Sequence, residues 1–347
     1  MKAALNRGVV AALGAALLFG AGTPFAKLLL TRTDPWLLAA LLYLGSGAGL
    51  WLLRRVRRSP SVRPSAHEWG WLAGATLAGG VVGPVLLMYG LTSMSATGAS
   101  LLLNAEGVFT ALIAWFVFKE NFDRRIALGM MAIVAGAVVL SWPGEMSMQV
   151  DIGALAVLGA CLAWAIDNNL TRRVSLSDAS FIAMVKGLAA GSTNLLLAWK
   201  LGSSWPETST LGAAALLGFL SYGASLVLFV VALRHLGTAR TGAYFSVAPF
   251  FGALLGVLML NEPVTAQLLM AGALMAVGVW LHLTELHGHL HTHEADEHMH
   301  EHVHDAHHQH VHPEGSDNVE RHSHAHTHVV MTHSHGHFPD AHHRHPH

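Results

Sequence analysis

Charge and cysteine are both scarce in this chain of 347 residues. Only 12% of the residues are Asp, Glu, Lys or Arg, about half the share of a typical soluble domain, which argues against a large water-exposed surface. Cys161 is the single cysteine, so an intrachain disulfide is excluded. The formal net charge of −1 with neutral His gives no case for a nucleic-acid partner. No G-x-x-x-x-G-K-S/T motif occurs, so ATP is not the direct energy source.

Long apolar runs take the place of the missing charge. Hydrophobic residues make up 52% of the chain, and they gather in runs near the length a helix needs to cross roughly 30 Å of hydrocarbon at about 1.5 Å per residue. The composition therefore predicts an all-α membrane protein with ten transmembrane helices. The predicted spans are about 8–30, 35–53, 69–91, 95–118, 125–142, 152–171, 179–199, 210–233, 239–260 and 264–284.

The loops between these spans differ in basic residues. With a cytoplasmic N-terminus, the segments on the inner side hold 14 Lys and Arg residues and those on the outer side hold 3. Because Lys and Arg accumulate in cytoplasmic loops, this bias predicts that the N-terminus is cytoplasmic. Ten spans then return the C-terminus to the cytoplasm as well.

The chain also carries a weak internal repeat. The segment EGVFTALIAWFVFKE at 106–120 aligns with APFFGALLGVLMLNE at 248–262, at an offset of 142, and the same offset relates Gly136 to Gly278. A repeat of five spans is odd-numbered, so the second copy enters the membrane upside down. Inverted repeats are typical of alternating-access carriers, whose binding sites lie near the midplane between the halves. We predict two five-helix repeats at 1–145 and 146–285, followed by a tail at 286–347.

These features resemble the EamA type of the drug/metabolite transporter superfamily. The resemblance covers roughly residues 8–284 and rests on the ten spans in two halves, the short Arg-bearing inner loops, and the similar span endings at Glu120 and Glu262. One departure is Gly107, preceded by Glu106, where the second copy has the family-like Pro249. The resemblance implies a carrier of the inner (plasma) membrane, usually an exporter of amino acids, nucleotides, amphipathic drugs or related metabolites. It implies no enzymatic activity and no required cofactor.

Glu106 lies near the centre of the fourth predicted span. An ionisable group at membrane depth costs roughly 2.5–3.5 kcal/mol on insertion scales, so it is expected to face a cavity or a partner. A carboxylate here suits a proton relay or the cationic group of a substrate. The alternative interpretation is a carboxyl group that hydrogen-bonds a neighbouring helix. Asn104 lies two residues earlier and is expected on a different helix face.

Asp167 and Lys186 form a second candidate pair. They lie on sequential spans at comparable predicted depths, so their side chains can reach each other. They are interpreted either as a structural ion pair between two helices or as a pair that opens to admit a charged substrate or ion. Asn168 follows Asp167, and Asn194 shares a helix face with Lys186.

Glu120 and Glu262 end the fourth and ninth spans at opposite membrane faces. Their matching positions suggest gating or helix capping. The blander interpretation, which we favour from the sequence, is that each is a solvated helix end.

The tail is the strongest departure from the apolar composition. Of the 26 histidines, 23 follow Glu285, together with nine Asp or Glu residues. Such a segment cannot bury a core and is expected to be disordered when free. Mobile imidazoles suit Zn²⁺, Ni²⁺, Co²⁺ or Cu²⁺. The predicted metal ligands are His287, His289, His291, His293, His298, His300, His302, His304, His307, His308, His310, His312, His322, His324, His326 and His328.

Three functions remain open from the sequence. The first is a metabolite carrier, usually an exporter, in which Glu106, Asp167, Lys186, Asn104, Asn168 and Asn194 line the pathway and the tail responds to metal. The second is a divalent-cation efflux carrier whose tail collects ions. The third is a membrane-anchored metal buffer or sensor. The implied partners are the lipid bilayer, a small-molecule or ion substrate, divalent metals and, for a homodimer, a second copy of the chain.

Overall fold

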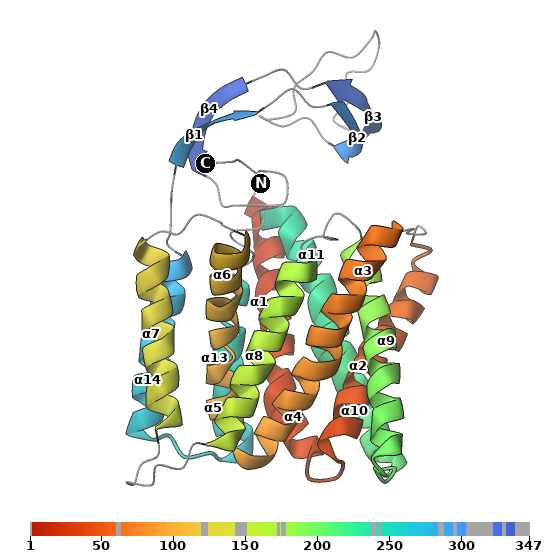
Figure 1. Cartoon of the computed structure of the whole chain (residues 1–347), viewed down its shortest axis with the longest axis vertical. Coiled ribbons are helices and arrows are strands. Elements are labelled where there is room, and N and C mark those ends of the chain that lie inside the picture. Colours follow the sequence, from red (N-terminus) through yellow and green to blue (C-terminus); the bar gives the residue numbers. More distant parts are fainter. Residues whose placement is uncertain are drawn as a thin grey trace. The chain divides into compact units, whose positions relative to one another are not determined.

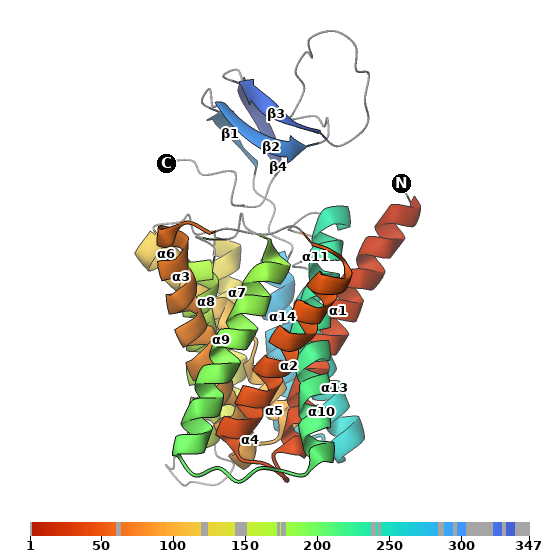
Figure 2. The ribbon, with the colours of Figure 1, turned by 90° about the vertical axis from the view of Figure 1, so that its right-hand side faces the viewer.

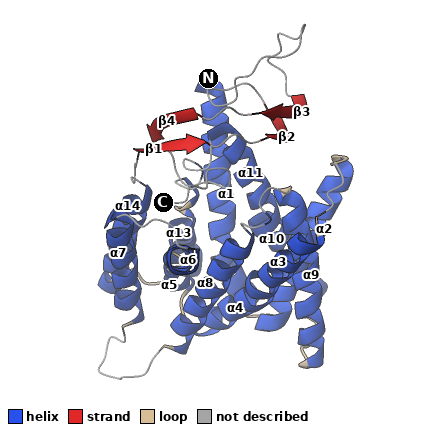
Figure 3. Ribbon diagram, turned by 45° about the horizontal axis from the view of Figure 1, so that its top comes forward, coloured by secondary structure: helices blue, strands red, loops and turns tan. Residues whose placement is uncertain are grey.

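The computed structural model describes most of the chain. The described residues are 2–59, 64–118, 124–142, 151–171, 174, 178–236, 241, 244–283, 288–293, 297–302, 322–327 and 331–336. The chain divides into two compact units, Met1–Glu285 and Leu286–His347. Helices make up the first unit and strands occur in the second (Figure 3).

The first unit is a bundle of helices whose axes lie roughly along one line (Figure 1). Two π-helical segments join α3 to α4 and α10 to α11. In chain order the elements are α1 (Lys2–Leu29), α2 (Pro35–Val56), α3 (Ala66–Ala75), η1 (Thr76–Val82), α4 (Gly83–Ser93), α5 (Ala96–Leu102), α6 (Ala105–Phe118), α7 (Arg124–Ser141), α8 (Ile152–Thr171), α9 (Ala179–Lys200), α10 (Thr208–Gly218), η3 (Phe219–Ala224), α11 (Ser225–Leu236), α13 (Ala248–Leu260) and α14 (Ala266–Leu283).

Length and composition make many of these helices candidate membrane spans. Among the described residues, seven helical stretches are long and apolar enough to cross a membrane, and three further apolar helices are shorter. The short ones are Ala127–Ser141, Ala248–Leu260 and Ala266–Leu281. All ten stretches lie where the sequence predicted spans. The span predicted at 239–260 contains a turn at Ser246 and Val247, between the helical residues 244–245 and α13, which begins at Ala248.

Three further candidate spans contain breaks. η1 interrupts the third span and η3 interrupts the eighth. A turn at Leu103–Asn104 separates α5 from α6 in the fourth span. Each break alters the regular hydrogen bonding of a helix and frees backbone groups, which inside a bilayer must find partners within the protein.

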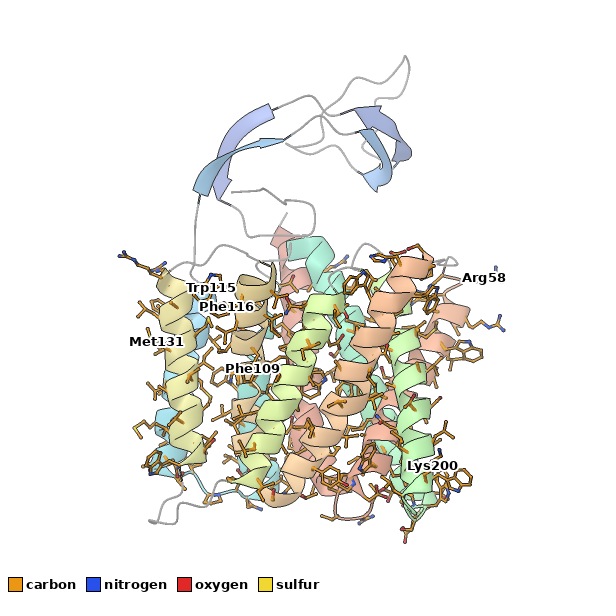
Figure 4. The ribbon with its side chains drawn as sticks, in the orientation of Figure 1. Arg58, Phe109, Trp115, Phe116, Met131 and Lys200 are labelled. Atoms are coloured by element: carbon orange, nitrogen blue, oxygen red, sulfur yellow. The ribbon has the colours of Figure 1, made fainter. Side chains whose placement is uncertain are left out.

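Large apolar side chains cover the outside of the bundle. Met131 on α7 points outward from the bundle (Figure 4), and Phe116 on α6 is 68% exposed. The buried core is rich in alanine. It also holds leucine side chains, among them Leu38 and Leu42 of α2 and several from α4. Small residues inside and large apolar residues outside are the arrangement expected where helices pack closely and lipid covers the surface.

Close glycine contacts between two of the helices are reciprocal. α2 and α9 have 22 residues each and pack side by side. A β-carbon at Gly47 would lie 2.5 Å from the Leu188 nitrogen, and one at Gly191 would lie 2.7 Å from the Leu44 nitrogen. Adding 144 to Gly47 and Leu44 gives Gly191 and Leu188. The same contact is therefore made twice, once from each helix.

α7 and α14 repeat this pattern. A β-carbon at Gly136 would lie 2.9 Å from the Ala271 carbonyl oxygen, and one at Gly278 would lie 2.6 Å from the Gly129 carbonyl oxygen. Adding 142 to Gly136 and Gly129 gives Gly278 and Ala271. Glycine is required at both positions because the opposing backbone leaves no room for a side chain.

One end of the α2–α9 contact carries an ion pair. The Arg54 guanidinium donates to the Asp178 carboxylate at 2.7 Å, and Asp178 caps α9 by accepting from Ser180 and Phe181 backbone nitrogens. Partial burial raises the pKa of Asp178, but the hydrogen bonds from Ser180 and Arg54 outweigh it and hold the pKa below its ordinary value. The charged cap therefore fastens the start of α9 to the end of α2.

The second unit contains four strands where the sequence predicted a tail without regular structure. β1 (Gly288–His293) pairs with β4 (Met331–Gly336), and β2 (Glu297–His302) pairs with β3 (His322–Thr327); both pairs are antiparallel. The prediction of disorder therefore differs from the structure in these four segments. The alternating His-x-His pattern has the two-residue period of a strand, and pairing satisfies backbone groups that a core-less segment would leave to water.

The reciprocal glycines give a test of the packing. We expect Gly47→Ala and Gly191→Ala each to destabilise the protein by about 1–3 kcal/mol, because each β-carbon forces two backbones apart. Gly212→Ala is the matched control, since no atom lies within 4 Å of its added β-carbon and alanine favours a helix. Thermal unfolding in detergent measures the effect. Equal melting temperatures for all three variants would contradict the close approach.

Candidate functional site

Asp167 of α8 and Lys186 of α9 form a buried ion pair. The Lys186 ammonium lies 2.5 Å from Asp167 Oδ1, and the two side chains are 17% (Lys186) and 8% (Asp167) exposed. Thr171, one turn further along α8, donates to Asp167 Oδ1 at 2.8 Å. The pairing expected from the sequential spans is therefore present. The carboxylate is fully provided with donors, as a buried charge requires.

The π-helical segment η1 makes room for this pair. The Gly79 carbonyl accepts hydrogen bonds from Tyr43 Oη at 2.7 Å and Trp164 Nε1 at 2.8 Å. A β-carbon at Gly79 would overlap the Asp167 carboxylate. Glycine at this position thus allows the carboxylate to approach the backbone, while side chains of α2 and α8 satisfy the carbonyl oxygen that the π-helical turn leaves available.

Asn194 lies on the other side of the same segment. Its Nδ2 donates to the Gly80 carbonyl at 3.1 Å, and the residue is completely buried. Its Oδ1 is a buried acceptor with no hydrogen-bond partner in the structure. Asn194 therefore supports the backbone behind the ion pair and keeps one acceptor unused.

Glu106 lies in the first turn of α6, directly after the break in the fourth span. Its Oε1 accepts from Asn168 Nδ2 at 2.7 Å, and the same amide lies 3.5 Å from Thr110 Oγ1. Asn168 and Gly107 are exposed, and a β-carbon at Gly107 would have no atom within 4 Å. Glu106 thus has an amide as its donor, where Asp167 has an ammonium.

Asn104 does not join this network. It is buried, and its Nδ2 donates to the Leu101 carbonyl at 2.9 Å. The side chain therefore caps the end of α5. Its contact is one that stabilises the break between α5 and α6.

α8 connects the two polar groups. Asp167 contacts α9 and η1, whereas the next residue, Asn168, contacts α6. Asn169 adds a third contact, donating to the Thr110 carbonyl at 3.3 Å. Adjacent residues of a helix point in directions about 100° apart, so one short polar segment of α8 reaches both neighbours.

Five aromatic rings extend away from this polar region. Tyr43 lies 5.5 Å from Tyr222, which lies 6.0 Å from Phe19. Phe19 lies 5.4 Å from Phe245, which lies 5.0 Å from Phe229. These centroid distances are typical of interacting aromatic pairs. Tyr43 belongs to both groups, because its hydroxyl contacts Gly79 and its ring begins the aromatic row.

Sequence reasoning found the charges but missed their supports. Gly79, Tyr43, Trp164, Thr110 and Thr171 were not predicted. Thr171 could have been found, since it lies four residues after Asp167 and therefore on the same helix face. Gly79 stands in a Gly-Gly pair, a pattern that close helix packing alone also explains. Tyr43 and Trp164 carry no local signal, because their partner is a backbone carbonyl on another span.

The predicted metal ligands belong to the second unit. Within the part of the chain that the structure describes, no group of three His, Cys, Asp or Glu residues could hold a metal ion. Nine predicted ligands lie in strands: His289, His291, His293, His298, His300, His302, His322, His324 and His326. The others, namely His287, His304, His307, His308, His310, His312 and His328, lie outside the described residues.

Comparison with known proteins identifies the first unit. A family model described as the EamA-like transporter family matches residues 6–142 and 151–284. The chain belongs to the EamA-like transporter family. The two matches fall on successive segments, so each half carries its own EamA-like sequence. Family membership and the apolar helices together make the chain a multi-pass membrane transporter.

Individual relatives support the family. An "Uncharacterized transporter" of Methanothermobacter thermautotrophicus is 27% identical over 292 residues, covering 79% of this chain and 85% of the relative. One of Archaeoglobus fulgidus is 26% identical over 270 residues, covering 76% and 92%. A "Probable 4-amino-4-deoxy-L-arabinose-phosphoundecaprenol flippase subunit ArnE" of Pseudomonas fluorescens is 33% identical, over 25% of this chain and 74% of the relative.

A solved crystal structure has the same fold. It superposes with a TM-score of 0.60 at 21% identity, covering 80% of this chain and 97% of that chain. At this identity the likeness shows the fold alone. The EamA-like fold therefore accounts for the bundle and not for the His-rich second unit.

The ion pair gives a test of the site's electrostatics. Asp167→Asn and Lys186→Met should each destabilise the protein by about 3–5 kcal/mol, because each leaves a buried charge without its partner. The double variant Asp167→Asn/Lys186→Met should be more stable than either single variant. Melting temperatures in detergent measure the difference, with Lys200→Met at the exposed end of α9 as control. Additive losses in the double variant would show that the two charges do not compensate each other.

Proposed function

We propose that this EamA-family transporter is a secondary carrier that exports a small organic molecule by alternating access. The molecule binds beside Glu106, Asp167 and Lys186, near the middle of the bundle. Its ten spans form two inverted five-helix halves in the inner membrane, with both termini on the cytoplasmic side. The single observation that carries the proposal is the pair of unlike carboxylates on α6 and α8, one neutralised by a lysine and one not.

The two inverted halves are supported by three kinds of symmetry. The family model matches once in each half. π-helical segments interrupt the third and the eighth span. The contact of Gly47 with Leu188 and that of Gly191 with Leu44 are the two copies that a local two-fold axis produces. Such an axis repeats every contact between two residues as a contact between their equivalents. An odd number of spans per half places this axis in the membrane plane.

The chemistry of the site favours a molecule with a protonated amine or similar donor. Lys186 already compensates the charge of Asp167. Glu106 has only the Asn168 amide as a described donor, so a proton or a cationic group is the partner that its charged form lacks. The aromatic row that starts at Tyr43 offers flat apolar surface next to these charges. Together these groups suit an amphipathic amine.

Glu106 provides the test of this function. We expect Glu106→Gln to reduce uptake into proteoliposomes to about one tenth of wild type or less, because a hydrogen bond to a charged group contributes roughly 1.5–3 kcal/mol. The assay uses a panel of labelled aromatic amines and amino acids, together with labelled Zn²⁺. Glu207→Gln, which removes an exposed carboxylate, is the control.

Two outcomes would overturn the proposal. Glu106→Gln transporting the wild-type compound at the wild-type rate would remove the carboxylate from the pathway. Transport of Zn²⁺ alone would favour the divalent-cation carrier, for which no metal-ligand cluster lies among the described residues.

We propose further that the tail binds Zn²⁺, Ni²⁺ or Co²⁺ and regulates the carrier. Its support is the number of histidines and the strand register. Residues opposite each other on paired strands lie about 4.5–5.5 Å apart, so paired histidine positions can contribute to one metal site. The His–His rungs are His289 with His335, His291 with His333, His298 with His326, His300 with His324, and His302 with His322.

Removing the tail separates regulation from transport. Deletion of residues 286–347 should leave the uptake rate in metal-free buffer unchanged and abolish the change in rate that Zn²⁺ or Ni²⁺ causes in the full chain. A full-length variant with the five paired rungs changed from His to Gln is the matched control and should behave like the deletion. If the deletion lowers transport without metal, the tail is part of the carrier rather than a regulator.

A further inference from the structure

The turn between α4 and α5 lies at the end of the bundle opposite the N-terminus (Figure 2). α4 ends at Ser93 and α5 begins at Ala96. The end of a helix leaves backbone carbonyls without intrahelical partners, and the start of a helix leaves N–H groups in the same state. This turn therefore presents both kinds of unsatisfied group within a few residues.

A lysine from α1 satisfies the carbonyl side. The Lys27 ammonium donates to the Leu91 carbonyl and, at 2.9 Å, to the Met94 carbonyl. Lys27 lies in the last turn of α1, so its side chain links the first span to the end of the third. A positive charge at the carbonyl end of a helix is stabilised by the helix dipole.

A glutamate that follows α13 satisfies the N–H side. The two oxygens of Glu262 accept from the Ala96 nitrogen at 2.7 Å and the Thr97 nitrogen at 2.8 Å. Asn261 ends α13 in the left-handed conformation, with φ of 50°, which turns the chain so that Glu262 reaches α5. The expectation of a solvated helix end is therefore wrong for Glu262. Glu120, its counterpart in the first half, lies outside the described residues.

These two charges act on the helix that leads to the candidate site. α5 runs from the turn to the break at Leu103–Asn104, and Glu106 follows in the next turn. α5 also packs on α13 beneath the glutamate, where Thr97 Oγ1 donates to the Ala253 carbonyl at 3.3 Å. A displacement of α5 from α13 would have to break the Glu262 contacts first, and it would move the start of α6 with it.

We infer that Lys27 and Glu262 form the gate that closes this end of the carrier. Both ties join the α4–α5 turn to a different span, one to α1 and one to α13. When they are made, the bundle is shut at the end opposite the N-terminus. When they break, α5 separates from α13 and opens a route from that side to Glu106. The inference rests on the proposed alternating access.

A single cysteine beneath the gate reports its opening. Thr97→Cys is introduced into a Cys161→Ala background, so that it is the single cysteine. Thr97 is 2% exposed, and the substitution replaces one small side chain with another. A membrane-impermeant thiol reagent is applied from the gate side of the full-length protein in vesicles. We expect Lys27→Met and Glu262→Gln to raise the labelling rate by about tenfold, because each removes charged hydrogen bonds that keep the gate closed.

Matched controls remove the same charges at the same end of the bundle. Lys200 lies at the far end of α9 (Figure 4), and Glu207 precedes α10; both are exposed. Lys200→Met and Glu207→Gln should leave the labelling rate unchanged. Equal labelling in gate and control variants would overturn the inference, as would a lower melting temperature of the gate variants with no change in labelling.

A cross-link distinguishes a gate from local fraying. Thr97 and Ala253 meet across α5 and α13, and both already carry a β-carbon. Thr97→Cys/Ala253→Cys therefore puts a thiol on each helix at this contact. Oxidation should stop uptake of the compound that wild type transports, and reduction should restore it.

The two readouts separate this inference from the proposed function. Labelling requires no substrate, so unchanged labelling together with loss of transport in Glu106→Gln overturns the gate alone. Normal transport through the oxidised cross-link also overturns the gate, because α5 and α13 would then not need to separate.

Discussion

The need to satisfy every polar group inside an apolar bundle governs this structure. The Asp167–Lys186 ion pair can exist only because Gly79 carries no side chain and because Thr171 provides a further donor. The backbone that makes this room is a π-helical segment, and its Gly79 carbonyl is in turn satisfied by Tyr43 and Trp164. The groups around Asp167 are accommodated in the core because neighbouring spans supply their partners.

The same constraint explains the irregular spans. A regular helix uses its backbone N–H and carbonyl groups in its own hydrogen bonds. By contrast, η1 and the turn at Leu103–Asn104 leave backbone groups free to bond other partners inside the bundle. Side chains on neighbouring spans occupy these groups, so the breaks tie the bundle together. They also place Glu106 at the start of a helix within the bundle. In carriers, such discontinuous helices surround the binding site.

Glycine packing and charged contacts hold different parts of the bundle together. Glycine contacts between α2 and α9 and between α7 and α14 hold equivalent helices at a distance that no side chain permits. Charges such as Arg54 with Asp178 and Lys27 with the α4–α5 turn act at the ends, where helices expose unpaired backbone. Glycine contacts cannot open without loss of packing over a whole helix. The charged ends depend on a few hydrogen bonds, which makes them the natural places for a conformational change.

The sequence by itself determined the apolar helical stretches and the ionisable residues within them, because hydrophobic runs of fixed length and isolated ionisable residues are local signals. It also placed Asp167 near Lys186, since they stand at similar depths on sequential helices. Only the tertiary structure decided that Glu106 has an amide partner, that Gly79 admits the carboxylate, and that Glu262 caps α5. These contacts join residues that are 62, 88 and 166 positions apart, and no local pattern encodes which backbone group a distant side chain will meet.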